Sequence, residues 1–309
     1  MPHSTNTYLI LALVVVLAAT AGFAASFDII ALVPYIPLRE AASSTLSFLS
    51  FGLNPLSAAL SLIVSSVLVP VTYFFAETPA VFVIALLSSL GYLLGLWRLC
   101  LLVMLSLLLI VSFGHFPETM TTLSLLTAST VLALLLGIPL GIAKARSRGI
   151  SRVIDPILDF METLPLFVYL VPVVLFFAIG TVPGVVAAFI VSLPPVVRRT
   201  ALGIEQIPEE CLEAGRAFGA TPFQLLRTIT LPLALPSILA GVREVIMLSL
   251  SMVIVASVVG APGLGQTLYA SIVQLEVGQG IASGISIVLL TILLDRLTRA
   301  AERLVSKHS

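Results

Sequence analysis

Long apolar runs separated by short polar segments make up most of the chain. They cover residues 8–27, 56–75, 80–97, 99–113, 119–143, 161–179, 184–197, 233–259 and 281–294. Most of them approach the length of a membrane-spanning helix, which needs about 20 apolar residues. They do not show the alternation of apolar and polar positions that a transmembrane β-strand requires. The pattern therefore predicts an all-α, polytopic transmembrane helical bundle with roughly eight or nine spans.

Basic residues predict which ends of these spans face the cytoplasm, because cytoplasmic loops carry an excess of Lys and Arg. One basic cluster follows the run 119–143, and a second one lies in the C-terminal tail. The clusters are Lys144, Arg146, Arg148 and Arg152, and Arg296, Arg299, Arg303 and Lys307. The side of the N-terminus depends on whether residues 56–75 cross the bilayer or lie in its interface, and the sequence leaves both open. Residues 8–27 are expected to be a retained span, because residues 1–7 contain no Lys or Arg of a signal peptide.

Composition supports a membrane protein. The chain is 59% hydrophobic and 10% charged, with a mean hydropathy of +1.18, whereas soluble domains carry about 25% charged residues. A formal net charge of zero gives no indication of nucleic acid. Cys100 and Cys211 lie far apart without metal-type spacing, so no metal is expected. Gly137–Gly141 is not followed by the Gly-Lys-Ser/Thr of a phosphate loop, so no nucleotide or other cofactor is expected on this chain.

The segment 207–241 begins with a polar stretch that predicts two short helices joined by a tight turn. Pro208 suits the first position of a helix, and the acidic residues after it favour the positive end of a helix dipole. Gly219 occupies the position at which a left-handed residue usually ends a helix. Thr221 and Gln224 form the pattern of a capping box for a second helix, which Leu231-Pro232 is expected to close.

The same segment resembles the EAA signature of ABC-importer permeases, which is Glu-Ala-Ala, three residues, Gly, nine residues, Ile, one residue and Leu-Pro. The corresponding residues here are Glu213, Ala214, Gly215, Gly219, Ile229, Leu231 and Pro232, with Gly215 in place of the third Ala. The resemblance implies that these residues couple a separate ATPase to the membrane spans. It also implies N-terminal spans over residues 1–118, a core permease domain over 119–303 with the coupling helix-turn-helix at 205–232, and a cytoplasmic tail over 304–309.

Longer stretches resemble the permease subunit of glycine betaine/proline betaine (quaternary amine) importers. They are residues 162–173, 182–185, 193–198, 248–254, 263–266 and 294–298. The resemblance implies the ABC importer type I permease fold in the cytoplasmic (inner) membrane. It further implies a homodimer, an ABC ATPase subunit that binds ATP, and an external substrate-binding protein. The chain itself is then expected not to be an enzyme.

A quaternary ammonium ion is attracted to the faces of aromatic rings, and several aromatic residues lie in the proline-broken run 161–179. The candidate pathway residues are Phe167, Tyr169, Phe176 and Phe177, together with Ser249 and Ser251. The resemblance places primary substrate recognition on the binding protein instead.

Three other readings compete with this one. An ABC importer permease for another small solute, such as an amino acid or a sulfonate, shares the same signature. An ion-coupled carrier usually holds ionisable residues near mid-membrane, but Arg243 and Glu244 are expected near the cytoplasmic end of their span. Their role is left open between snorkelling at the interface and a contact to a partner or the path. A membrane enzyme requires a catalytic motif, such as His-Glu-x-x-His or Gly-x-Ser-x-Gly, that the sequence lacks.

Overall fold

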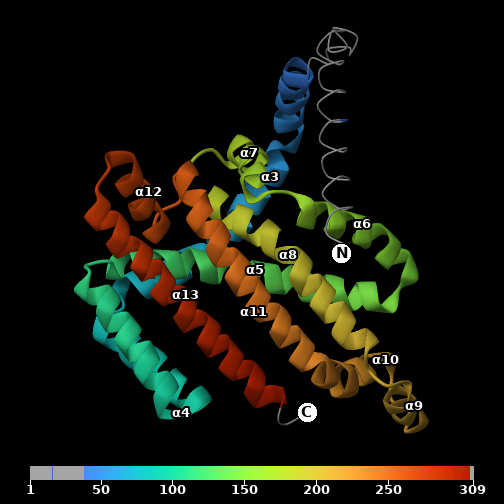
Figure 1. Ribbon diagram of the computed structural model, residues 1–309. Coiled ribbons are helices and arrows are strands. Elements are labelled where there is room, and N and C mark those ends of the chain that lie inside the picture. Colours follow the sequence, from blue (N-terminus) through green and yellow to red (C-terminus); the bar gives the residue numbers. More distant parts are fainter. Residues whose placement is uncertain (1–15, 17–37, 307–309) are drawn as a thin grey trace, which may run out of the picture. The chain divides into compact units, whose positions relative to one another are not determined.

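The computed structural model describes residue 16 and residues 38–306 (Figure 1). The chain divides into two compact units, 1–52 and 53–309, and the second contains every helix from the later part of α3 onward. The helices are α3 (Leu38–Glu77), α4 (Ala80–Ser112), α5 (Phe116–Arg146), α6 (Arg148–Thr163), α7 (Leu166–Phe177), α8 (Thr181–Glu205), α9 (Glu209–Ala217), α10 (Pro222–Leu225), the π-helix η1 (Leu226–Thr230), α11 (Leu231–Val255), the 3₁₀ helix η2 (Ala256–Val259), α12 (Leu264–Gln274) and α13 (Val277–Ser306). The predicted all-α architecture is confirmed for the described residues.

Five helical segments in the described part of the chain are long and apolar enough to cross a membrane. They are Ser57–Glu77, Phe116–Arg146, Thr181–Glu205, Pro222–Val259 and Val277–Val305. The predicted span 8–27 lies outside the described residues. The segment predicted as one span over 161–179 is divided instead, because α6 and α7 meet at an angle of 105°. Leu164 precedes Pro165, and a residue before proline is pushed out of the helical conformation, which ends α6 there.

The helix α4 folds back on itself. An added Cβ at Gly91 would lie 3.4 Å from the backbone of Cys100, although nine residues of straight helix extend about 13.5 Å. The chain therefore reverses between two apolar arms, Ala80–Leu94 and Trp97–Ser112. This agrees with the division of this region into the two predicted runs 80–97 and 99–113. Each arm is roughly 22–24 Å long at 1.5 Å per residue, which is shorter than the about 30 Å hydrocarbon core.

The helix α8 lies against both α5 and α11 (Figure 1). The main buried apolar cluster includes residues of all three helices. Small residues bring the helices into close contact. A Cβ added at Gly137 would lie 2.0 Å from Val196, and one at Gly203 would lie 2.7 Å from Ser237. Helices in lipid associate largely through such close packing, because apolar side chains are equally well accommodated by lipid.

The basic segment after α5, which was predicted to be a cytoplasmic loop, contains the helix α6. The hydroxyl of Ser147 caps this helix by accepting the Ile150 N–H at 3.4 Å. Lys144 on α5 pairs with Asp155 at 2.8 Å, and Arg198 on α8 pairs with Glu162 at 2.8 Å. These two ion pairs fix the polar face of α6 against the ends of two core helices.

The close approach of α5 and α8 predicts that Gly141 tolerates no side chain. A Cβ there would lie 2.8 Å from the carbonyl oxygen of Val197 and 2.6 Å from Thr200. Since a backbone atom cannot rotate away, we expect Gly141→Ala to destabilise the protein by about 1–3 kcal/mol. Calorimetry of the detergent-purified protein measures this as a lower unfolding midpoint.

The matched control is Gly278→Ala, because no heavy atom lies within 4 Å of a Cβ added at that helical glycine. Alanine there should leave the midpoint unchanged or raise it. A Gly141→Ala midpoint equal to or above that of the control would contradict the packing described for α5 and α8.

Candidate functional site

A polar element of about twenty-five residues joins the end of α8 to the start of α11, two helices of the core (Figure 1). Within it, α9 begins after Pro208 and carries Glu209 and Glu210 in its first turn. The acidic first turn complements the positive end of the helix dipole, as predicted. Pro208 occupies the N-cap position, one residue before the predicted one.

A tight, fully hydrogen-bonded turn ends α9. Gly219 has a φ of +79°, which is the left-handed conformation predicted for it. Its N–H donates to the Arg216 carbonyl at 2.9 Å, and the Ala220 N–H donates to the Gly215 carbonyl at 3.1 Å. This pair of bonds is the Schellman arrangement, which satisfies the last carbonyls of a helix. The turn thus requires a left-handed residue at position 219, a conformation that a residue with a side chain resists.

The next helix begins at once with the predicted capping box. The Thr221 hydroxyl accepts the N–H of Gln224 at 3.4 Å, and the Gln224 side-chain oxygen accepts the N–H of Thr221 at 2.8 Å. Pro222 occupies the first turn, where its missing N–H leaves no bond unmade. The two caps, one on each side of Gly219, make the turn stiff.

Leu231-Pro232 does not close the second helix, so that prediction was wrong. Residues 222–259 form one continuous helical segment, in which α10 leads through the π-helix η1 into α11. The N–H of Leu231 donates to the carbonyl of Leu226, five residues earlier. Proline in an ordinary helix clashes with the carbonyl four residues before it, and the wider π turn just ahead of Pro232 relieves this. The polar element is therefore joined to a membrane span without a break.

Gly215 packs α9 against the π turn. It is the buried residue of α9, and an added Cβ would lie 2.6 Å from the terminal methyl groups of Leu225 and Ile229. Two positions of the predicted signature, Gly215 and Ile229, thus lie against each other across the turn. Glu213 and Ala214 are exposed on the outer side of α9. These predicted coupling residues therefore take three positions in the structure. Gly215 and Ile229 form an inner contact, Gly219 forms the turn, and Glu213 and Ala214 face outward.

Two exposed aromatic residues flank the turn, and sequence reasoning missed both. Phe218 is 93% exposed and Phe223 is 69% exposed. Their position on either side of Gly219 in an otherwise polar segment was the available signal. The guanidinium of Arg146, at the end of α5, donates to the carbonyl of Pro222 at 3.4 Å. The element thus presents apolar rings and carboxylates outward while it contacts the core behind.

The structure gathers only part of the predicted pathway set. Tyr169, Phe176 and Phe177 line a wholly apolar cavity of about 390 Å³, together with Phe160, whereas Phe167 is exposed outside it. The Tyr169 hydroxyl donates to the carbonyl of Met161.

The two serines of that set face different surroundings. Ser249 is fully buried, and its hydroxyl lies 2.6 Å from that of Ser192 on α8. Ser251 is exposed, and its hydroxyl donates to the carbonyl of Met247 at 3.0 Å.

Several membrane-length helices pack around α8, and a stiff polar helix-turn-helix is continuous with one of them. These features define the class of protein as a multi-pass helical membrane protein. Its family is shown by comparison with known proteins. The chain belongs to the family described as binding-protein-dependent transport system inner membrane component, whose model matches residues 133–307. Members of this family are transport permeases and not themselves enzymes, which excludes the membrane-enzyme reading.

Two similar proteins are also described as transport system permeases. The chain is 42% identical over 221 residues to the glycine betaine transport system permease protein OpuAB of Bacillus subtilis (strain 168), covering 72% of this chain and 78% of that protein. It is 48% identical over 198 residues to the glycine betaine/proline betaine transport system permease protein ProW of Escherichia coli (strain K12). That match covers 64% of this chain and 56% of the relative, so it spans about half of the relative's length.

A solved structure has the same fold. The methionine ABC transporter MetNI, in an inward-facing conformation, matches 61% of this chain and 93% of its own with a TM-score of 0.54 and 25% identity. The predicted family and the predicted permease fold are therefore confirmed.

Substitution by alanine should have opposite effects on hydrogen exchange at Gly219 and at Gly215. Gly219→Ala forces a side chain into the left-handed region, which costs about 1–2 kcal/mol. We expect the amides of residues 209–220 to exchange hydrogen roughly tenfold faster than in the parent chain in lipid nanodiscs.

Gly215→Ala is the matched control, because the atoms it would meet are the mobile ends of Leu225 and Ile229. Alanine also favours a helix by about 0.5–1 kcal/mol over glycine. Exchange should stay at or below the parent rate. If Gly215→Ala accelerated exchange as much as Gly219→Ala, the turn would not depend on the left-handed residue.

Proposed function

We propose that this chain is the membrane-spanning permease subunit of an ATP-driven importer for glycine betaine, proline betaine or a related quaternary amine. The similarity to OpuAB and ProW, at 42% and 48% identity, supports this substrate class. We place the chain in the cytoplasmic membrane with the segment 205–232 on the cytoplasmic side. The basic residues Lys144, Arg146, Arg148 and Arg152 support this orientation through the excess of positive charge in cytoplasmic loops.

The continuous path from the exposed turn into α11 is the observation that carries the proposal. Phe218 and Glu213 face outward, the turn at Gly219 is fixed by caps on both sides, and Gly215 packs on the π turn that leads into the span. A force applied at Phe218 is therefore delivered to a membrane helix with no flexible joint between them. An element of this kind suits the transmission of rigid-body motion.

The partner that applies this force is proposed to be a separate ABC ATPase subunit. The exposed rings of Phe218 and Phe223 offer an apolar anchor, and aromatic anchors dominate the energetics of many interfaces. Glu209, Glu210 and Glu213 add negative charge beside them, which suits basic groups on the partner. ATP would bind to that subunit.

Two further partners complete the proposed assembly, namely a second copy of this chain and an external substrate-binding protein. The family name, which refers to binding-protein-dependent transport, supports the latter. Primary substrate recognition is then assigned to the binding protein. The aromatic cavity of Tyr169, Phe176 and Phe177 is the part of this chain best suited to an ammonium group, because aromatic faces attract cations.

Uptake by the complete assembly tests the proposal. The chain is reconstituted into vesicles with its ATPase and binding protein, and labelled glycine betaine is supplied outside. We expect ATP-dependent uptake that unlabelled proline betaine inhibits and that amino acids and sulfonates do not. The Gly219→Val variant should insert normally and lose uptake at least about tenfold, because a strained turn of about 1–2 kcal/mol breaks the rigid path.

The control for the variant is Gly278→Val, a glycine with open space around it, which should transport at the parent rate. Uptake of an amino acid or a sulfonate in place of glycine betaine would refute the substrate class. Parent-level uptake by Gly219→Val would refute the coupling role while leaving the substrate class intact.

A further inference from the structure

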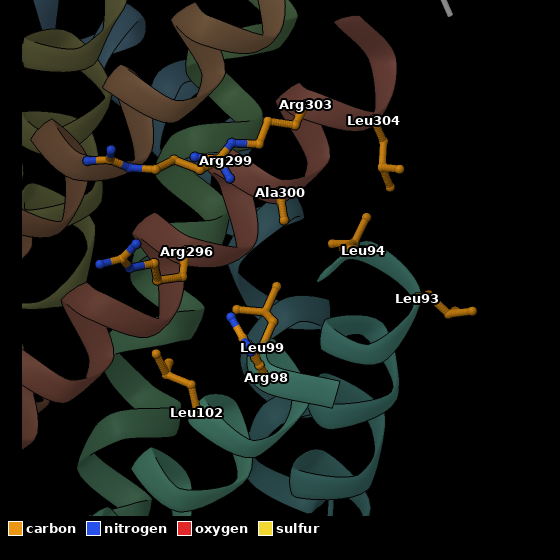
Figure 2. Close-up of a pocket in the computed structure, with 10 residues that line it drawn as sticks. All are labelled: Leu93, Leu94, Arg98, Leu99, Leu102, Arg296, Arg299, Ala300, Arg303 and Leu304. Carbon is orange, nitrogen blue, oxygen red and sulfur yellow. The ribbon is translucent and has the colours of Figure 1, made fainter. Parts of the chain in front are cut away.

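A cavity of about 750 Å³ lies between α4 and α13, away from the element described above. Four of the residues that line it are arginines, and most of the others are leucines. Figure 2 shows that Arg98 comes from α4, whereas Arg296, Arg299 and Arg303 come from α13. The cavity therefore combines a strongly basic wall with an apolar one.

The positive charge of this cavity is largely uncompensated. The nearby carboxylate of Asp295 already binds two guanidinium groups, those of Arg243 and Arg299, each at 2.8 Å. In the part of the chain that the structure describes, no carboxylate lies within ion-pair distance of Arg98, Arg296 or Arg303. Guanidinium groups bind phosphate oxygens through paired hydrogen bonds, so these arginines suit a phosphate-bearing anion.

The apolar wall indicates what else the anion carries. Leu94 and Leu102 on α4, both partly exposed, line the cavity beside the arginines, and Leu93, at its edge, is 75% exposed. A free phosphate ion has no apolar part that could cover these leucines. A phospholipid has acyl chains that can cover them. The combination of basic and apolar walls thus favours a lipid over a soluble anion.

The position of the cavity suits the boundary between the membrane and water. Trp97 is 59% exposed, and the guanidinium of Arg98 lies 5.6 Å from the centre of its ring. Tryptophan is enriched at this boundary, and basic residues are enriched on its cytoplasmic side. On α13, the arginines begin where the apolar part of the helix ends. Basic pockets between membrane helices on the cytoplasmic side bind anionic headgroups.

We propose that one anionic phospholipid, with a headgroup such as phosphatidylglycerol, binds between α4 and α13. Its phosphate lies between Arg98 and the arginines of α13, and its acyl chains lie along Leu94 and Leu102. The bound lipid relieves the repulsion among the guanidinium groups and links the α4 hairpin to α13.

Native mass spectrometry of the detergent-purified full chain tests this site. Phosphatidylglycerol and phosphatidylcholine with identical acyl chains are titrated separately, because they differ in headgroup charge. We expect one phosphatidylglycerol to remain bound with an affinity at least roughly tenfold above that of phosphatidylcholine. Arg98→Gln and Arg296→Gln should each reduce this preference several-fold, and the double variant should abolish it.

Arg148→Gln is the matched control, since Arg148 is also exposed but lies on α6 and does not line the cavity. It should keep the full preference. Equal binding of the two lipids, or an equal loss in Arg148→Gln, would overturn the proposal. Inorganic phosphate forms a third arm. If it competed with phosphatidylglycerol at equal concentration, the site would be one for a soluble phosphate instead of a lipid.

Discussion

The close packing of α8 between α5 and α11 is the constraint on which the rest of the structure depends. In a bilayer, apolar side chains gain little by leaving lipid for one another, so helices associate where small residues let their backbones approach. Glycines provide these points along α8. Gly137 and Gly141 on α5 and Gly241 on α11 lie against side chains of α8. Gly203 on α8 lies against Ser237 of α11. Because the element of residues 206–230 connects α8 to α11, it begins and ends on the two helices of this contact.

Charged residues then fix the helix ends that the glycines bring together. Arg243 and Glu244 are adjacent on α11 and point about 100° apart. Arg243 binds Asp295 on α13 at 2.8 Å, and Glu244 binds Arg199 on α8 at 3.1 Å. Both residues are thus paired within the chain, an arrangement that neither of the two alternatives from the sequence included. Partly exposed ion pairs contribute about 0–1 kcal/mol each, so their main effect is to set orientation.

The features that could be predicted from the sequence depend on neighbours along the chain. The left-handed Gly219, the capping box of Thr221 and Gln224, and most of the apolar helices belong to this group. Each is specified within a few residues, by a missing Cβ, a hydroxyl three residues before an amide, or a run of apolar side chains.

The features that could not be predicted depend on contacts between different helices. The π turn before Pro232 lies against α9 through Gly215, and Ser249 is buried by a contact to Ser192, 57 residues away. The arginine cavity requires the α4 hairpin to lie beside α13, about 200 residues later. The exposure of Phe218 is a third case, because the partner proposed to cover this ring is not part of this chain.

The central claim is that the element containing Phe218 is the surface through which an ATPase acts on the membrane helices. A photo-activated cross-linking amino acid placed at position 218 of the transporting assembly tests it most directly, with Tyr73 on α3, which is 69% exposed, as the control position. We expect a covalent product between this chain and the ATPase subunit from position 218 and none from position 73. Membranes that transport the solute but yield no ATPase product from position 218 would contradict it.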